Sequence, residues 1–243
     1  MPSAKRQLAL TAELVASVAR VVEDAGPSPG AVYLTDADYD AIIRDMLAQA
    51  PAGDLWLFGY GSLLWKPSFE YTERRMATVQ GWHRSFCLRI ARFRATRDQN
   101  GLMMVLDRGG QCQGMILRVP ADQASSVLNG LFRRELVVNP PATPPRWLTA
   151  QTADGPVRAL GFVIDRRSPF YAGRLPLEAV ADVLSKAAGH WGSCAEYLQN
   201  TVAHLEELGI RDRNLWRLQA LVAERIMAAA SPLQPHSDLV ESM

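Results

Sequence analysis

A short apolar run that ends in a glycine-rich turn is the feature that most constrains this chain. Residues 55–58 read Leu-Trp-Leu-Phe, with no polar side chain among them. Such a run is typical of a strand that is buried on both faces. Gly59 and Gly61 follow, and two glycines one residue apart let the backbone approach a ligand closely. The sequence therefore predicts a core strand and then a turn. The backbone N–H groups of this turn either hold an anion or only close a tight turn in which Ser62 bonds its own backbone.

The remaining elements predict one α+β domain. Apolar residues recur at helical spacing over residues 9–23 and 37–48, which form an N-terminal helical extension, residues 1–51. Strands are expected over residues 76–88, 102–106, 112–119, 147–152 and 157–164. The first of these has a bulge at Gly81, and a turn at residues 107–110 joins strands 102–106 and 112–119. Helices are expected over residues 121–132, from Pro176 onward, over 194–208 and over 214–229. The prediction is a mixed, mostly antiparallel, barrel-like sheet with flanking helices over residues 52–230, followed by a flexible tail, 231–243.

Composition excludes several classes of function. The formal net charge of the 243 residues is +1, which gives no bias toward nucleic acid or a membrane surface. No apolar run is long enough to span a bilayer, and Glu13 and Arg20 interrupt the N-terminal apolar positions that a signal peptide would need. The three cysteines are widely separated and form no Cys-x-x-Cys pair, so we expect a cytoplasmic location. The sequence leaves the oligomeric state open.

Metal and serine chemistry have little support. The four histidines, His83, His190, His204 and His236, show none of the spacings that are typical of metal ligands. Ser62 lies in Gly-Tyr-Gly-Ser-Leu, which lacks the Gly-x-Ser-x-Gly spacing of a nucleophile elbow. A serine-dependent amide hydrolase therefore stays only as an alternative hypothesis.

Two kinds of charged residue are candidates for the site: an acid that can move protons and a set of arginines that can bind a substrate carboxylate. Glu135 ends a predicted helix and precedes three apolar residues, so both the helix dipole and burial raise its expected pKa. A carboxyl group of this kind can move protons, although a salt bridge to an arginine is the default interpretation. Four arginines after the second strand can bind a substrate carboxylate, and the sequence does not choose among them: Arg89, Arg92, Arg94 and Arg97.

The glycine turn lies within a longer string, residues 58–65, which reads Phe-Gly-Tyr-Gly-Ser-Leu-Leu-Trp. This string resembles the Tyr-Gly-Ser-Leu loop of the γ-glutamylcyclotransferase superfamily, in particular of its ChaC-type, glutathione-specific branch. Residues 81–89 resemble the second strand of the bacterial branch, and residues 187–198 resemble its late Gly…Glu-Tyr-Leu segment. The resemblance runs from residue 55 to about residue 215.

The resemblance implies a reaction and a set of site residues. The reaction is the cyclising cleavage of the γ-glutamyl amide of glutathione to 5-oxoproline and cysteinylglycine, with no cofactor and no metal. The Arg-Glu step at residues 134–135 matches the family's catalytic glutamate, which makes Glu135 the catalytic residue. The implied substrate-binding residues are Tyr60, Gly61, Ser62, Leu63 and Tyr197. A non-catalytic module that binds γ-glutamyl ligands is a further alternative.

The sequence departs from the family at one point. Relatives often carry a tyrosine a few residues after the glutamate, whereas residues 139–145 here contain four prolines and no tyrosine. Tyr60 or Tyr197 is expected to supply the phenol in its place.

Overall fold

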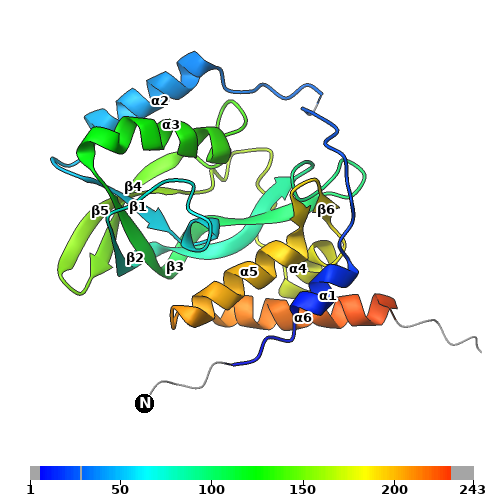
Figure 1. Ribbon diagram of the computed structural model, residues 1–243. Helices are drawn as coiled ribbons and strands as arrows, with labels where there is room; N and C mark the ends of the chain where they lie inside the picture. The colour runs from blue at the N-terminus through cyan, green and yellow to red at the C-terminus, as the bar shows by residue number, and fades with distance from the viewer. Residues whose placement is uncertain (1–5, 28, 231–243) are drawn as a thin grey trace, which may run out of the picture.

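The computed structural model describes residues 6–27 and 29–230, and Figure 1 shows their arrangement. Five strands form a closed barrel in the order β1-β3-β2-β4-β5. Their bounds are β1 Leu55–Gly59, β2 Glu73–Ile90, β3 Gly101–Val119, β4 Pro145–Thr152 and β5 Gly155–Phe162. All neighbours are antiparallel except β1 and β5, which meet in parallel at Leu57 and Leu160. The prediction of a mixed, mostly antiparallel, barrel-like sheet is confirmed. The predicted tail, residues 231–243, lies outside the described residues.

The two longest strands correct one prediction. A turn was expected at residues 107–110, but β3 runs unbroken through them and pairs with β2 on both sides. Gly109 and Gly110 have φ values of 107° and 64°, and they lie opposite Gly81, where the register between the strands shifts. Because the partner strand continues past these glycines, they form a bulge and not a turn. The bulge predicted at Gly81 is confirmed.

Helices cover the barrel on two sides (Figure 1). Helices α2 (Asp36–Ala48) and α3 (Ala124–Glu135) pack together on one side, and the short helices η1 (Ser62–Leu64) and η2 (Ala121–Gln123) lie in the connections. Helices α1 (Ala12–Ser17), α4 (Leu177–Leu184), α5 (Cys194–Glu207) and α6 (Arg213–Ala230) gather on the other side, next to the small hairpin of β6 (Ala188–Gly189) and β7 (Gly192–Ser193). The described residues form three hydrophobic clusters. The largest joins the barrel interior to the C-terminal helices, the second joins the barrel to α2 and α3, and a small third one contains Cys87, Val105 and Ile164.

The N-terminal extension differs from its prediction. A helix was expected over residues 9–23, but α1 begins after its N-cap Thr11 and ends at Ser17. The next residues instead bond to distant parts of the molecule: Arg20 donates to the carbonyl oxygen of Lys186, and Asp24 accepts from Arg92. These tertiary contacts override the helical pattern of the sequence.

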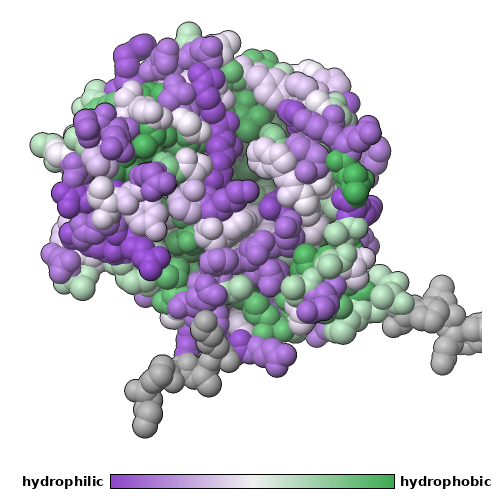
Figure 2. Space-filling model, in the orientation of Figure 1, coloured by the Kyte–Doolittle hydropathy of each residue, from purple (hydrophilic) through white to green (hydrophobic). Residues whose placement is uncertain are grey.

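The surface is mixed. Hydrophilic side chains dominate the face in Figure 2, with small hydrophobic patches between them. None of the helices that the structure describes is long and apolar enough to cross a membrane.

Candidate active site

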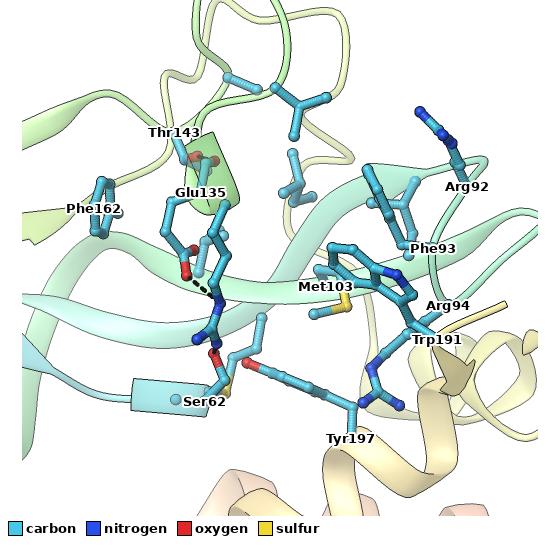
Figure 3. A pocket seen from close by; sticks show the side chains of 18 of the residues that line it. Ser62, Arg92, Phe93, Arg94, Met103, Glu135, Thr143, Phe162, Trp191 and Tyr197 are labelled. Carbon is cyan, nitrogen blue, oxygen red and sulfur yellow. Dashed lines mark hydrogen bonds and ion pairs between the residues drawn. The ribbon is translucent and has the colours of Figure 1, made fainter. Parts of the chain in front are cut away.

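A cavity of about 610 Å³ opens beside the barrel, and segments distant in the sequence line it. The glycine turn after β1, the end of α3, the ends of β2 and β3, the β6–β7 hairpin and α5 all contribute residues (Figure 3). This volume lies within the range of about 300–1,000 Å³ that is common for small-molecule sites. Glu135 and Ser62 lie at one end of the cavity, and Phe93 and Trp191 lie at the other.

The glycine turn lines one side of the cavity, and its backbone is tightly packed. The first turn of η1 is closed by a hydrogen bond of 2.9 Å from the backbone N–H of Leu64 to the carbonyl oxygen of Gly61. A Cβ atom at Gly61 would lie 2.8 Å from the hydroxyl oxygen of Tyr197 and 3.1 Å from Cε of Met104. An alanine at this position would therefore require Tyr197 and Met104 to shift, which explains why glycine packs well here.

A buried arginine, which the sequence analysis did not single out, holds this turn. Nε of Arg84 donates to the carbonyl oxygen of Tyr60 at 2.7 Å, and Nη1 lies 3.5 Å from Asp212. The hydroxyl group of Tyr60 in turn donates to the carbonyl oxygen of Phe162 at 3.1 Å. Burial raises the pKa of Tyr60 well above its usual value, so its phenol keeps its proton. Tyr60 thus fixes the turn to the barrel on both sides.

Glu135 is the last residue of α3, and the helix is placed by its apolar face. Leu128, Leu131 and Phe132, at positions i, i+3 and i+4, are fully buried against the barrel. The helix ends because Leu136 adopts an extended conformation and a proline-rich segment follows. The glutamate side chain is 27 % exposed. Burial raises the pKa of its carboxyl group, and the positive charge of Arg134 opposes this effect.

Arg134 connects Glu135 to the glycine turn. Its Nε lies 3.2 Å from the glutamate Oε1, and its Nη2 donates to the hydroxyl oxygen of Ser62 at 2.7 Å. Its Nη1 donates to the carbonyl oxygen of Lys66 at 2.8 Å, at the far end of the turn. One guanidinium therefore sets the distance between the acid and the loop. The salt bridge that is the default for Glu135 is present, within a larger network.

Tyr197 reaches the same place from α5. Ser193 caps this helix by accepting a hydrogen bond of 3.0 Å from the backbone N–H of Glu196. The Tyr197 hydroxyl points toward Ser62 and the Glu135 end of the cavity (Figure 3). Burial, and next the charge of Glu135, raise the pKa of Tyr197 to about 12. Its phenol is therefore a hydrogen-bond donor at neutral pH.

The four arginines separate into two groups. Arg89, Arg92 and Arg94 line the cavity, whereas Arg97 donates to the carbonyl oxygen of Pro27 and does not line it. Arg94 is held by Glu196 at 2.6 Å, and Arg92 forms a bidentate pair with Asp24. Of these three, Arg92 and Arg94 are thus oriented by carboxylates before any ligand binds.

Three aromatic residues of the cavity lining, Phe93, Phe170 and Trp191, are called the aromatic wall, and Phe93 and Trp191 lie at the end opposite Glu135. The rings of Phe93 and Trp191 lie 4.3 Å apart between their centroids. Trp191 is 53 % exposed, which is unusual for so large an apolar side chain. Sequence reasoning missed this wall, although an aromatic residue between Gly189 and Gly192 is a signal that deserved a prediction.

Histidines and metal ligands do not enter the cavity in the part of the chain that is described. His83 and His204 bond to backbone carbonyl groups, and His190 lies 3.6 Å from Asp24, while His236 lies outside the described residues. No histidine is among the described residues that line the cavity. Nor do these residues include a group of three or more metal-ligating side chains that could hold an ion.

Comparisons with known proteins agree with this geometry. Residues 55–225 match the family model described as ChaC-like protein. A relative from Escherichia coli, named glutathione-specific γ-glutamylcyclotransferase, is 37% identical over 164 residues, which is 67% of this chain and 70% of the relative. Human glutathione-specific γ-glutamylcyclotransferase 1 is 35% identical over 62% of this chain and 72% of its own length.

A solved structure shares the fold. The crystal structure of a γ-glutamyl cyclotransferase specific to glutathione from yeast superposes with a TM-score of 0.65 and covers 71% of this chain and 96% of that one, at 19% identity. The turn, the Arg-Glu step and the late Glu-Tyr-Leu segment, which carried the resemblance in the sequence, all meet at the cavity. The chain belongs to the ChaC-like family.

Proposed function

We propose that this protein cleaves the γ-glutamyl amide of glutathione by cyclisation, which releases 5-oxoproline and cysteinylglycine. The observation that carries the proposal is the convergence of Glu135, Ser62 and Tyr197 on one end of a single cavity. Membership in the ChaC-like family supports the same reaction. In this reaction the α-amine of the substrate attacks its own γ-carbonyl carbon, so the enzyme supplies no nucleophile.

Glu135 carries the proton in this mechanism. Its carboxylate accepts a proton from the attacking amine and returns it to the leaving nitrogen of cysteinylglycine. A raised pKa suits both steps, because it brings the carboxyl group closer to the pH at which the protein works. Arg134 holds Glu135 and the loop at a fixed separation, which keeps the carboxylate in place for both transfers.

The turn and Tyr197 position the substrate. Backbone N–H groups of Gly61, Ser62 and Leu63 bind the α-carboxylate, and this contact folds the γ-glutamyl chain so that its amine meets the carbonyl carbon. The protonated phenol of Tyr197 donates a hydrogen bond to a substrate oxygen, while Tyr60 keeps the turn in shape. Tyr197 thereby supplies the phenol for which residues 139–145 offer no tyrosine.

A serine-dependent hydrolase has less support. The hydroxyl oxygen of Ser62 accepts a hydrogen bond from Arg134, and a guanidinium cannot act as the general base that would take the serine proton. No histidine among the described cavity residues is placed to activate it. A module that only binds also has less support, because a partly buried carboxyl group at the binding site adds a desolvation cost that binding alone does not require.

We also propose the domain division and the location expected from the sequence. Residues 52–230 form the catalytic domain, and the extension of residues 1–51 completes the cavity mouth, since Ala31 and Tyr33 line it. All three cysteines are buried and free, which suits a reducing cytoplasm.

Product analysis in ¹⁸O-labelled water tests the proposal. Purified protein is incubated with glutathione, and the products are identified by mass spectrometry. Cyclisation gives unlabelled 5-oxoproline and cysteinylglycine, because water takes no part in it. Free glutamate that carries ¹⁸O would establish hydrolysis and contradict the proposal.

A further inference from the structure

The end of the cavity opposite Glu135 carries large aromatic side chains, whereas a cysteinylglycine leaving group has no large apolar group to place against them. Phe93 and Trp191 of the aromatic wall lie at this end, and Met103 lies between them and Glu135 (Figure 3); Phe170 also lines the cavity. Trp191 is 53 % exposed and Phe170 is 36 % exposed. Large apolar side chains left open inside a ligand cavity are a common sign of ligand contact.

Specific backbone contacts hold Phe93 and Trp191 of the aromatic wall in place. Phe93 has a φ of 68°, a left-handed conformation that a bulky residue rarely adopts and that surrounding contacts must hold. Its carbonyl oxygen accepts a hydrogen bond of 2.8 Å from the backbone N–H of Trp191. A Cβ atom at Gly189 would overlap this same carbonyl oxygen, so glycine is needed for the hairpin to pack there. The backbone therefore holds the two rings together at the cavity.

The order of the residues in glutathione indicates which group of the substrate faces the aromatic wall. With the γ-glutamyl end at Glu135, the next residue is cysteine, and its side chain branches one atom beyond the scissile nitrogen. The glycine carboxylate lies further on and suits a cation of the cavity lining such as Arg89, because Arg92 is already paired with Asp24. A free thiol is too small to cover three aromatic side chains, whereas an apolar group on the sulfur would remove them from water.

We propose that this protein also cleaves glutathione S-conjugates whose sulfur carries an apolar alkyl or arylmethyl group, and that the aromatic wall binds that group. The inference rests on the proposed function and adds a class of substrate to it. The chemistry is the same: the amine nitrogen bonds to the γ-carbonyl carbon, and the bond from that carbon to the cysteine nitrogen breaks. Glu135 moves the proton from the first nitrogen to the second. The products are 5-oxoproline and S-substituted cysteinylglycine, and the thioether stays intact.

Turnover of a graded series tests this proposal with the full chain. Glutathione, S-methylglutathione, S-hexylglutathione and S-benzylglutathione are compared by kcat/KM, with 5-oxoproline as the common product. We expect S-hexylglutathione and S-benzylglutathione to be cleaved at least as efficiently as S-methylglutathione. Cleavage of glutathione without cleavage of the two larger conjugates would overturn the proposal and leave the proposed function standing. If glutathione itself is not cleaved, the proposed function fails and the inference fails with it.

Variants of the wall locate the binding site. Trp191→Ala and Phe170→Ala each change an exposed side chain and leave the core intact. Each should lower the ratio of kcat/KM for S-benzylglutathione to that for glutathione about tenfold, as expected when a hydrophobic pocket loses part of its surface. Trp216→Ala, outside this cavity, is the matched control and should leave the ratio unchanged. An unchanged ratio in both wall variants would overturn the assignment of the wall.

Discussion

The two ends of the cavity are built in different ways. At the polar end, Glu135, Arg134 and Ser62 form a chain of contacts of 2.7–3.2 Å that ties the end of α3 to the glycine turn. At the aromatic end, Trp191 is open to solvent and is placed by backbone packing instead. In the proposed mechanism, a rigid polar network therefore holds the groups that move the proton, while the leaving group faces an open aromatic surface.

Removal of the Glu135 carboxyl group should cause the largest loss of activity, and it should affect the chemical step at the polar end and not substrate binding. Glu135→Gln keeps the shape of the side chain but cannot carry the proton, so kcat should fall about 10²–10⁴-fold. Affinity for substrate, measured by calorimetry, should change little. Glu196→Gln, on α5 beside Arg94, is a matched control and should lose far less activity. Wild-type turnover in folded Glu135→Gln protein would remove Glu135 from the mechanism.

A side chain added at Gly61 should cause the next largest loss of activity. Gly61→Ala places a Cβ atom against the Tyr197 hydroxyl, and displacement of these groups by about 1 Å should lower kcat/KM about 10²-fold. The double variant Gly61→Ala/Tyr197→Phe relieves the overlap, so it should retain more of the wild-type thermal stability than Gly61→Ala alone. Gly130→Ala, at a helical position with open space around it, is the control for the substitution itself. Full activity in Gly61→Ala would show that the close approach does not matter.

The pH dependence of activity should report the raised pKa of the partly buried Glu135. Because the base must be ionised, kcat/KM should fall about tenfold for each pH unit below the pKa of Glu135. Burial raises this pKa, so the fall should begin at a higher pH than for an ordinary glutamate. An acid limb at the usual carboxyl value would contradict a desolvated site.

The raised pKa of Glu135 should also affect stability: the free energy of unfolding should fall with rising pH over the range in which activity rises. The folded state binds the Glu135 proton more tightly than the unfolded state, so the free energy of unfolding should decline as pH rises from the ordinary to the raised pKa. Glu135→Gln should lack this decline. Denaturant unfolding of both proteins across this pH range measures it.

Loss of the loop hydroxyl should have the smallest effect. Ser62→Ala removes one acceptor of Arg134, but the contacts of Arg134 with Lys66 and Glu135 remain. Activity should fall about tenfold or less, in line with the loss of one hydrogen bond. Ser68→Ala is the control, because Ser68 lines the cavity as well. Complete loss of activity together with a trapped acyl-enzyme would favour the serine hydrolase.

The barrel strands and the acid at the end of α3 could be predicted from local patterns, whereas the roles of Glu135 and Tyr197 were predicted through the resemblance to a known family. The apolar run before Gly59 and the acid that closes α3 are visible in single stretches of sequence. The role of Arg84, the pairing of Arg92 with Asp24 and the aromatic wall are not, because each joins segments far apart in the chain. The same reason explains the shortened helix α1, where distant contacts decided the backbone conformation.

N-acetylglutathione gives the most direct test of the central claim, which is that the substrate supplies the nucleophile and Glu135 moves its proton. The analogue keeps the scissile amide, the thiol and both carboxylates, but its acylated nitrogen is a poor nucleophile. Its binding is measured by competition against glutathione, and its cleavage is followed by mass spectrometry. We predict that the analogue binds and survives. Cleavage at a rate near that of glutathione would contradict cyclisation and require Glu135 to activate water or Ser62 instead.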